Sequence, residues 1–265
     1  MNLKFNWLGL HISDFEASLR FYTEALGMNA SDVKKDWAYF STTGITFELF
    51  GGGKPPVPDR SSWGQGQAVR PSIQVTDLHA VVAEMRKRGV QFTSGIERTE
   101  FSEWIELFAP ENLRWTLAQA PAYPASPDLH KPHIGWMELK VNRMDEQRVF
   151  YRDVMGFHLE EGKNGQVVLR QEPGEPILFL IPGGQPAAPH QIQKGAFTPP
   201  PSHLISFETD DIEQAADWLK SRNIPILIGV TRKSWGGIDL YIADIDGNPI
   251  QIVQYVPADH EWTLS

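Results

Sequence analysis

Hydrophobic and polar positions alternate and then shift to helical spacing at the start of the chain. Alternation over residues 7–12 predicts a strand. Ser13 and Glu16 have capping-box spacing and predict where a helix begins, and Gly27 predicts where it ends. The apolar stripe of this helix consists of Phe15, Leu19, Tyr22 and Leu26. Two β-rich runs follow, so the first segment reads as a strand, a helix and further strands.

The same order of elements occurs four times. Stretches rich in proline, glycine and serine at 51–67, 120–132 and 182–201 separate four segments. Each segment opens with a short strand, continues into a helix behind a polar cap, and ends in several β-rich runs. This order predicts four βαβββ modules in an α+β fold, because a doubly wound fold would alternate single strands with helices.

The modules also repeat as pairs. Aligning Phe21 and Tyr22 with Phe150 and Tyr151 places Trp7 on Trp136. The repeat predicts two domains of two modules each, joined by a linker at 123–132. The expected domains are 1–122, with modules 1–54 and 68–122, and 133–265, with modules 133–184 and 201–258.

Composition narrows the classes of partner and of metal site. The formal net charge of -9, without a long run of lysine or arginine, argues against nucleic acid and anionic membranes as partners. No stretch has the roughly 18–20 apolar residues of a membrane span. The chain has no cysteine, which is typical of a cytoplasmic protein and leaves histidine, carboxylate or amide groups as the only metal ligands.

Three motifs resemble those of the glyoxalase, bleomycin-resistance and extradiol-dioxygenase superfamily, also called the vicinal oxygen chelate superfamily. They are FYTEALGM, FYRDVMGF and ADIDGNPIQI, in segments one, three and four. The resemblance implies that modules pair into curved antiparallel or mixed sheets that enclose a small-molecule site. It does not identify the reaction, because function depends on the site rather than on the fold.

The resemblance also implies positions for metal ligands, on the first and last strands of each module. The first-strand positions correspond to Trp7, Arg70, Trp136 and His203, and the last-strand positions to Glu48, Thr116, Leu180 and Gln251. Few of these side chains can bind a metal.

The expected site depends on which modules pair. If modules pair in sequence order, neither set reaches the roughly three protein ligands of a catalytic site, and Glu48 could instead form an ion pair with Arg70. If module one pairs with module four, then Glu48, His203 and Gln251 converge. They could hold one divalent metal (Fe, Mn, Ni or Zn), with Glu48 also acting as the catalytic base of a lyase, isomerase or dioxygenase.

A metal-independent role is the alternative that the residues favour. Trp7 and His11 share one side of the first strand, and Trp136, Glu138 and Lys140 share one side of the strand in segment three. With Arg70, these side chains could line a tryptophan-walled cavity for a small hydrophobic or aromatic molecule, without a cofactor. The tryptophans could equally fill space, and Glu138 and Lys140 could form surface pairs. We expect a monomer or homodimer, and whether the protein is an enzyme stays open.

Overall fold

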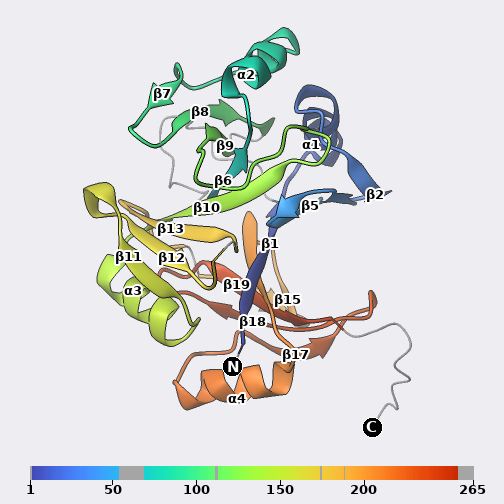
Figure 1. Cartoon of the computed structure of the whole chain (residues 1–265). Helices are drawn as coiled ribbons and strands as arrows, with labels where there is room; N and C mark the ends of the chain where they lie inside the picture. Colours follow the sequence, from blue (N-terminus) through green and yellow to red (C-terminus); the bar gives the residue numbers. More distant parts are fainter. Residues whose placement is uncertain (1, 54–68, 111–112, 174, 188, 256–265) are drawn as a thin grey trace.

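The computed structural model describes residues 2–53, 69–110, 113–173, 175–187 and 189–255, and these form four βαβββ modules (Figure 1). The first module contains β1 (Lys4–His11), α1 (Phe15–Arg20), the π-helix η1 (Phe21–Ala25), β2 (Ala30–Lys34), β3 (Trp37–Phe40), β4 (Thr43–Gly44) and β5 (Thr46–Phe50). The second contains β6 (Val69–Gln74), α2 (Leu78–Lys87), β7 (Glu97–Arg98), β8 (Glu103–Phe108) and β9 (Arg114–Gln119).

The second half of the chain repeats this order with similar lengths. The third module contains β10 (His133–Val141), α3 (Met144–Asp153), β11 (His158–Glu161), the short 3₁₀ helix η3 (Lys163–Gly165), β12 (Val167–Arg170) and β13 (Ile177–Pro182). The fourth, which follows the small hairpin of β14 (Ile192–Gln193) and β15 (Ala196–Phe197), contains β16 (His203–Glu208), α4 (Ile212–Ser221), β17 (Ile228–Arg232), β18 (Ile238–Ala243) and β19 (Pro249–Gln254). The predicted α+β class and module order are therefore confirmed.

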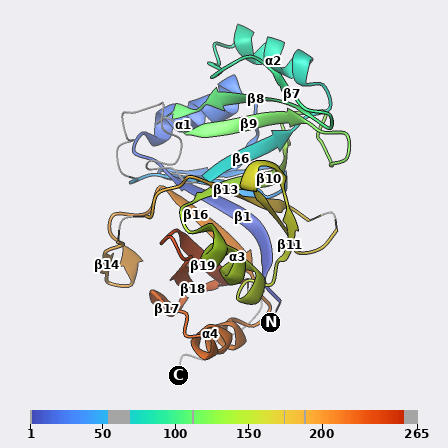
Figure 2. The ribbon, with the colours of Figure 1, turned by 90° about the vertical axis from the view of Figure 1, so that its left-hand side faces the viewer.

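Two large curved sheets run through the molecule, and each combines one module from each half of the chain (Figures 1 and 2). The first sheet has the order β17-β18-β19-β16-β1-β5-β3-β2, which joins modules one and four. The second has the order β11-β12-β13-β10-β6-β9-β8-β7, which joins modules two and three. Of the two pairings that the sequence left open, the structure has the one that crosses the halves.

Antiparallel pairs of first strands hold each sheet together at its centre. In the first sheet β1 pairs with β16, so that Leu8 lies opposite Ile205 and Trp7 opposite Ser206. Leu8, Leu10, Ile205 and Phe207 belong to the fully buried hydrophobic core. Because successive side chains point to opposite sides of a strand, Trp7 and Ser206 lie on the other side, which we call the polar face of the first sheet.

On the helix side of the sheets, contacts join the two modules that belong to the same half of the chain. Tyr22 of module one lies against Trp115 of module two, with ring centroids 5.6 Å apart, and Trp115 Nε1 donates a hydrogen bond of 2.9 Å to Tyr22 Oη. In the other half, Trp218 Nε1 of α4 donates to the Val154 carbonyl at the end of α3. Helix-side contacts therefore join the two modules within each expected domain, 1–122 and 133–265. Each of the two large sheets instead combines strands from both expected domains.

The first helix ends at the predicted residue but begins one residue later than predicted. The first helix begins after Asp14, whose carboxylate accepts a hydrogen bond from the Ala17 N–H, rather than after the predicted cap Ser13. Gly27 ends the helical segment with φ +80°, as predicted. In the described part of the chain, no helix is long and apolar enough to cross a membrane.

Helix α3 lacks a cap from its own N-terminal residue, Arg143, and receives one from module four. Asp246, in the turn between β18 and β19, has a fully buried side chain and accepts hydrogen bonds from the backbone N–H groups of Asn142 (2.7 Å) and Arg143 (3.3 Å). The side chain of Arg143 also donates to this carboxylate, at 3.3 Å. One aspartate thus holds the backbone that leads into α3, places a negative charge near the start of this helix, and ties module four to module three.

We predict that Asp246→Ala lowers the free energy of unfolding by about 2–3 kcal/mol, because it removes a fully buried carboxylate that accepts hydrogen bonds from two backbone N–H groups. Asp211→Ala is the matched control, since Asp211 caps α4 through a local bond to the Gln214 N–H and should cost about 1 kcal/mol. Urea denaturation measures both. Equal losses would show that the contact between modules adds nothing beyond a local cap.

Candidate functional site

The polar face of the first sheet carries a carboxylate between indole rings. Glu48 on β5 lies beside Gly9 of the neighbouring strand β1, and Trp37 Nε1 on β3 donates a hydrogen bond of 2.9 Å to Glu48 Oε2. Burial raises the pKa of Glu48, while the indole N–H groups of Trp37 and Trp7 act in the opposite direction. Glu48 is partly exposed, so its carboxyl group can be reached from solvent.

The indole of Trp7 lies on the same side of the sheet as Glu48. A Cβ atom placed on Gly9 would lie 2.7 Å from Trp7 Cη2, so the six-membered ring of the indole lies over this glycine. Phe50 packs against Trp7 edge to face with centroids 6.0 Å apart, and His11 stacks on Phe50 at 4.9 Å. Gly9 is required here because any side chain would displace the indole.

Gln251 lies within a closed polar network. Ser206 Oγ donates to Gln251 Oε1 at 2.6 Å, and Gln251 Nε2 donates to Asp239 Oδ2 at 2.8 Å and to Tyr241 Oη at 3.1 Å. Tyr241 Oη in turn donates to Asp239 Oδ2 at 2.7 Å, and Lys233 Nζ lies 3.1 Å from Asp239 Oδ1. The amide oxygen that would face a metal therefore already accepts a hydroxyl proton.

His203 does not lie beside Gln251. It pairs with Leu10, whereas Ser206, which binds Gln251, lies on the opposite side of β16. The counterpart of Trp7 is Leu204, since each precedes its helix cap (Asp14 and Asp211) by seven residues. A difference of one residue turns a strand side chain to the other face, and this places the His203 imidazole on the core side.

The residues present therefore do not fit the three-ligand metal site that the second pairing implied. Glu48 accepts a hydrogen bond from the Trp37 indole, the Gln251 amide is bonded to three neighbours, and His203 is directed to the other side of its strand. No group of three or more histidine, aspartate or glutamate side chains in the described ranges is arranged to hold a metal ion.

His203 is instead a buried imidazole on the core side of its strand. It is 5% exposed, and burial lowers its pKa from 6.5 to about 4, with further contributions from His190 and His11. Burial likewise lowers the pKa of His11 to about 4. Both rings are neutral at physiological pH, because charging them would place a cation in the interior without compensation.

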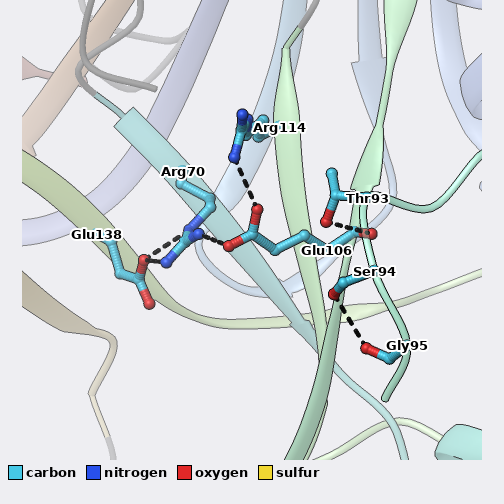
Figure 3. A network of polar contacts seen from close by, with 7 residues as sticks. All are labelled: Arg70, Thr93, Ser94, Gly95, Glu106, Arg114 and Glu138. Carbon is cyan, nitrogen blue, oxygen red and sulfur yellow. Dashed lines mark hydrogen bonds and ion pairs between the residues drawn. The ribbon is translucent and has the colours of Figure 1, made fainter. Parts of the chain in front are cut away.

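The second sheet carries ion pairs where the first carries indoles. Arg70 on β6 lies opposite Glu138 on β10, and its Nε donates to Glu138 Oε2 at 2.6 Å (Figure 3). Arg70 also forms an ion pair with Glu106 on β8, and Arg114 Nη1 donates to the second oxygen of Glu106 at 3.1 Å (Figure 3). We call these four residues the Arg70 network. Their side chains are 11–17% exposed.

The structure does not contain the ion pair between Glu48 and Arg70 that the sequence allowed. Glu48 and Arg70 lie on different sheets, and Arg70 is paired with Glu138 and Glu106. Lys140 follows Glu138 on the same side of β10, and its pKa is lowered by burial and by the charges of Arg70 and Arg114. Trp136 lies on this side too, packed against Phe179 and Tyr123 with centroids 6.0 and 5.6 Å away.

Sequence reasoning missed several members of these sites. Trp37, Asp239 and Tyr241 were not assigned to the first site, and Glu106 and Arg114 were not assigned to the second. Glu106 had the same signal as Glu48, a carboxylate between apolar neighbours in a strand, here Ile105 and Leu107. At the last-strand position of module three, Phe179 rather than Leu180 lies beside Glu138, again a difference of one residue.

Comparisons with known proteins agree with this architecture. The profile of the Glyoxalase/Bleomycin resistance protein/Dioxygenase superfamily matches residues 4–116 and 133–252. The chain belongs to this superfamily. No curated protein sequence matches it significantly.

Solved structures of the superfamily share the tandem fold. Glyoxalase I from Zea mays is 14% identical with a TM-score of 0.68, over 96% of this chain and 92% of that one. A mutant of the same enzyme is 15% identical with a TM-score of 0.71, over 95% and 94%. A provisionally assigned dioxygenase from Bacillus subtilis subsp. subtilis str. 168 is 16% identical with a TM-score of 0.68, over 96% and 86%. At these identities the likeness establishes the fold alone.

We predict that stability falls as the pH decreases from about 6.5 to about 4, because unfolded His203 binds a proton that the folded state excludes. His203→Asn should reduce this loss by roughly 3 kcal/mol, because the pKa of this imidazole is lowered from 6.5 to about 4 on folding. Urea denaturation at several pH values measures it. Burial raises the pKa of Asp244 from 3.8 to about 6, which acts in the opposite direction, so the two proteins must be compared at each pH.

We also predict that Arg70→Met costs about 3–5 kcal/mol of stability, because it strips two largely buried carboxylates of their shared cation. Combining it with Glu138→Met should recover part of the loss. Arg98→Met is the control, since Arg98 pairs with Glu103 but is 74% exposed and should cost less than about 1 kcal/mol. A double variant as unstable as Arg70→Met would contradict the coupling.

Proposed function

We propose that the protein binds a small aromatic or hydrophobic molecule on the polar face of the first sheet, without a complete metal site. The observation that carries this proposal is Glu48, a partly exposed carboxyl group with a raised pKa that is held by the indole of Trp37. A polar group set among aromatic rings is typical of sites that bind and orient flat organic ligands.

The rings around Glu48 divide into a buried floor and a partly exposed wall. Trp7 is 7% exposed and forms the floor over Gly9. Trp37, Tyr39 and Phe50 are partly exposed, lie on the same side of the sheet as Glu48, and form the wall. A flat ligand could stack on the rings of the wall and at the same time donate a hydrogen bond from a hydroxyl or N–H group to Glu48.

The expected affinity is modest for an unoptimised compound. Burying about 150 Å2 of ring surface contributes roughly 4 kcal/mol, which corresponds to binding near the millimolar range before a hydrogen bond to Glu48 is added. With its raised pKa, Glu48 is also the group on this face best suited to accept or donate a proton, should the bound molecule react.

The metal-dependent lyase or dioxygenase is not proposed, because Glu48, His203 and Gln251 do not converge as ligands. The expected small-molecule partner follows from the proposal above. A cytoplasmic location and a monomeric or homodimeric state stay predictions.

We predict that 2-naphthol binds the purified protein and that Glu48→Ala weakens this binding about tenfold, as loss of a hydrogen bond to a charged or buried acceptor requires. Titration calorimetry measures both proteins. Trp37→Phe should have a smaller effect, because it removes the indole N–H but keeps a ring.

Two controls make the test specific. Glu24→Gln, at an exposed helical position, should leave binding unchanged. The analogue 2-methoxynaphthalene has no hydroxyl donor and should not distinguish the parent protein from Glu48→Ala. Equal binding of 2-naphthol by both proteins, or a stoichiometric metal lost on Glu48→Ala, would overturn the proposal.

A further inference from the structure

The face of the second sheet that holds the Arg70 network is chemically unlike the polar face of the first sheet. Arg70, Arg114 and Lys140 supply three positive charges, and Glu106 and Glu138 supply two negative charges. The five groups together carry one net positive charge. Arg70, Arg114, Glu106 and Glu138 are mostly buried, so their charges are screened less than they would be at an exposed surface.

The pKa of Lys140 is lowered by its surroundings. Burial lowers its pKa first, and the nearby charges of Arg70 and Arg114 lower it further. A cation that is destabilised by two other cations gains from a nearby anion more than an isolated surface lysine does. One negative charge would bring the sum over the five groups to zero, whereas a dianion would exceed it.

One hydroxyl group and one amide oxygen on the same face are buried without a hydrogen-bond partner among the described residues. Thr116 lies opposite Glu106 and beside Ser72, and is 3% exposed. Its Oγ1 and the Oε1 of Gln74, which is fully buried, have no hydrogen-bond partner among the described residues. Buried polar groups of folded proteins are usually paired, so these two atoms are a second sign that a polar ligand or water belongs here.

Aromatic rings border the charged cluster. Trp136 precedes Glu138 by two residues on the same side of β10, and Phe179 lies beside Glu138 on β13. Tyr123 packs on Trp136, and its hydroxyl accepts a hydrogen bond of 3.1 Å from Arg170 Nη2. Trp136, Phe179 and Tyr123 are all partly exposed. They offer flat apolar surface next to the cations.

We propose that this face of the second sheet is a separate binding site for an aromatic monocarboxylate, with the carboxylate at Lys140 and the Arg70 network and the ring against Trp136. Arginine and lysine side chains bind carboxylates by charge-assisted hydrogen bonds, and the indole supplies the stacking surface. The site does not depend on Glu48 or on the function proposed for the first sheet.

Benzoate is the probe, and benzamide is its neutral analogue of nearly the same shape. Titration calorimetry on the full-length protein should show saturable benzoate binding at millimolar concentrations or below, weakening as salt increases. Lys140→Met should raise the dissociation constant about tenfold or more, and Lys140→Arg should retain most of the affinity. Benzamide should bind more weakly than benzoate and should be insensitive to Lys140→Met.

Control variants separate this site from general effects and from the first sheet. Lys87→Met removes a lysine whose side chain is 76% exposed and should leave benzoate binding unchanged. Glu48→Ala should also leave it unchanged, while weakening 2-naphthol. A thermal unfolding curve confirms that Lys140→Met is folded.

Three results would overturn the inference. They are no saturable binding of benzoate, equal affinity for benzoate and benzamide, or a folded Lys140→Met protein with unchanged benzoate affinity.

Discussion

The pairing of first strands from opposite halves of the chain is the constraint on which the rest of the structure depends. β1 pairs with β16 and β6 pairs with β10, each in an antiparallel register that fixes which side chains face the core. Because alternation has a period of two residues, this register assigns every later strand residue to the core or to the opposite face. The positions of Trp7, Glu48, Arg70 and Glu138 all follow from it.

Two kinds of contact interlock the halves. The sheets join module one to module four and module two to module three, whereas helix-side contacts join neighbours along the chain. The Tyr22–Trp115 contact and the Asp246 cap of α3 belong to the second kind. Module one also reaches module three, because β4 pairs with β10. Neither sheet can be completed by one half of the chain alone.

Duplication of the fold has left two faces with different chemistry. On the first sheet, an indole lies over Gly9 and a carboxyl group is held among rings. On the second, equivalent strand positions carry Arg70 and its carboxylates. Buried apolar residues of the core face hold the fold together, while the opposite face of each sheet carries these polar groups.

The sequence alone determined the order of elements, the fourfold repeat and the superfamily, because hydrophobic periodicity and the FYTEALGM and FYRDVMGF motifs are local. It also selected Glu48, Arg70, Glu138 and the tryptophans as residues of interest. It could not decide which modules pair, since both pairings bury the same apolar residues. Only the tertiary structure decided that Arg70 meets Glu138 and Glu106, and that His203 turns to the core. The physical reason is that strand register is set by partners far away in the chain, and a shift of one residue reverses a side chain.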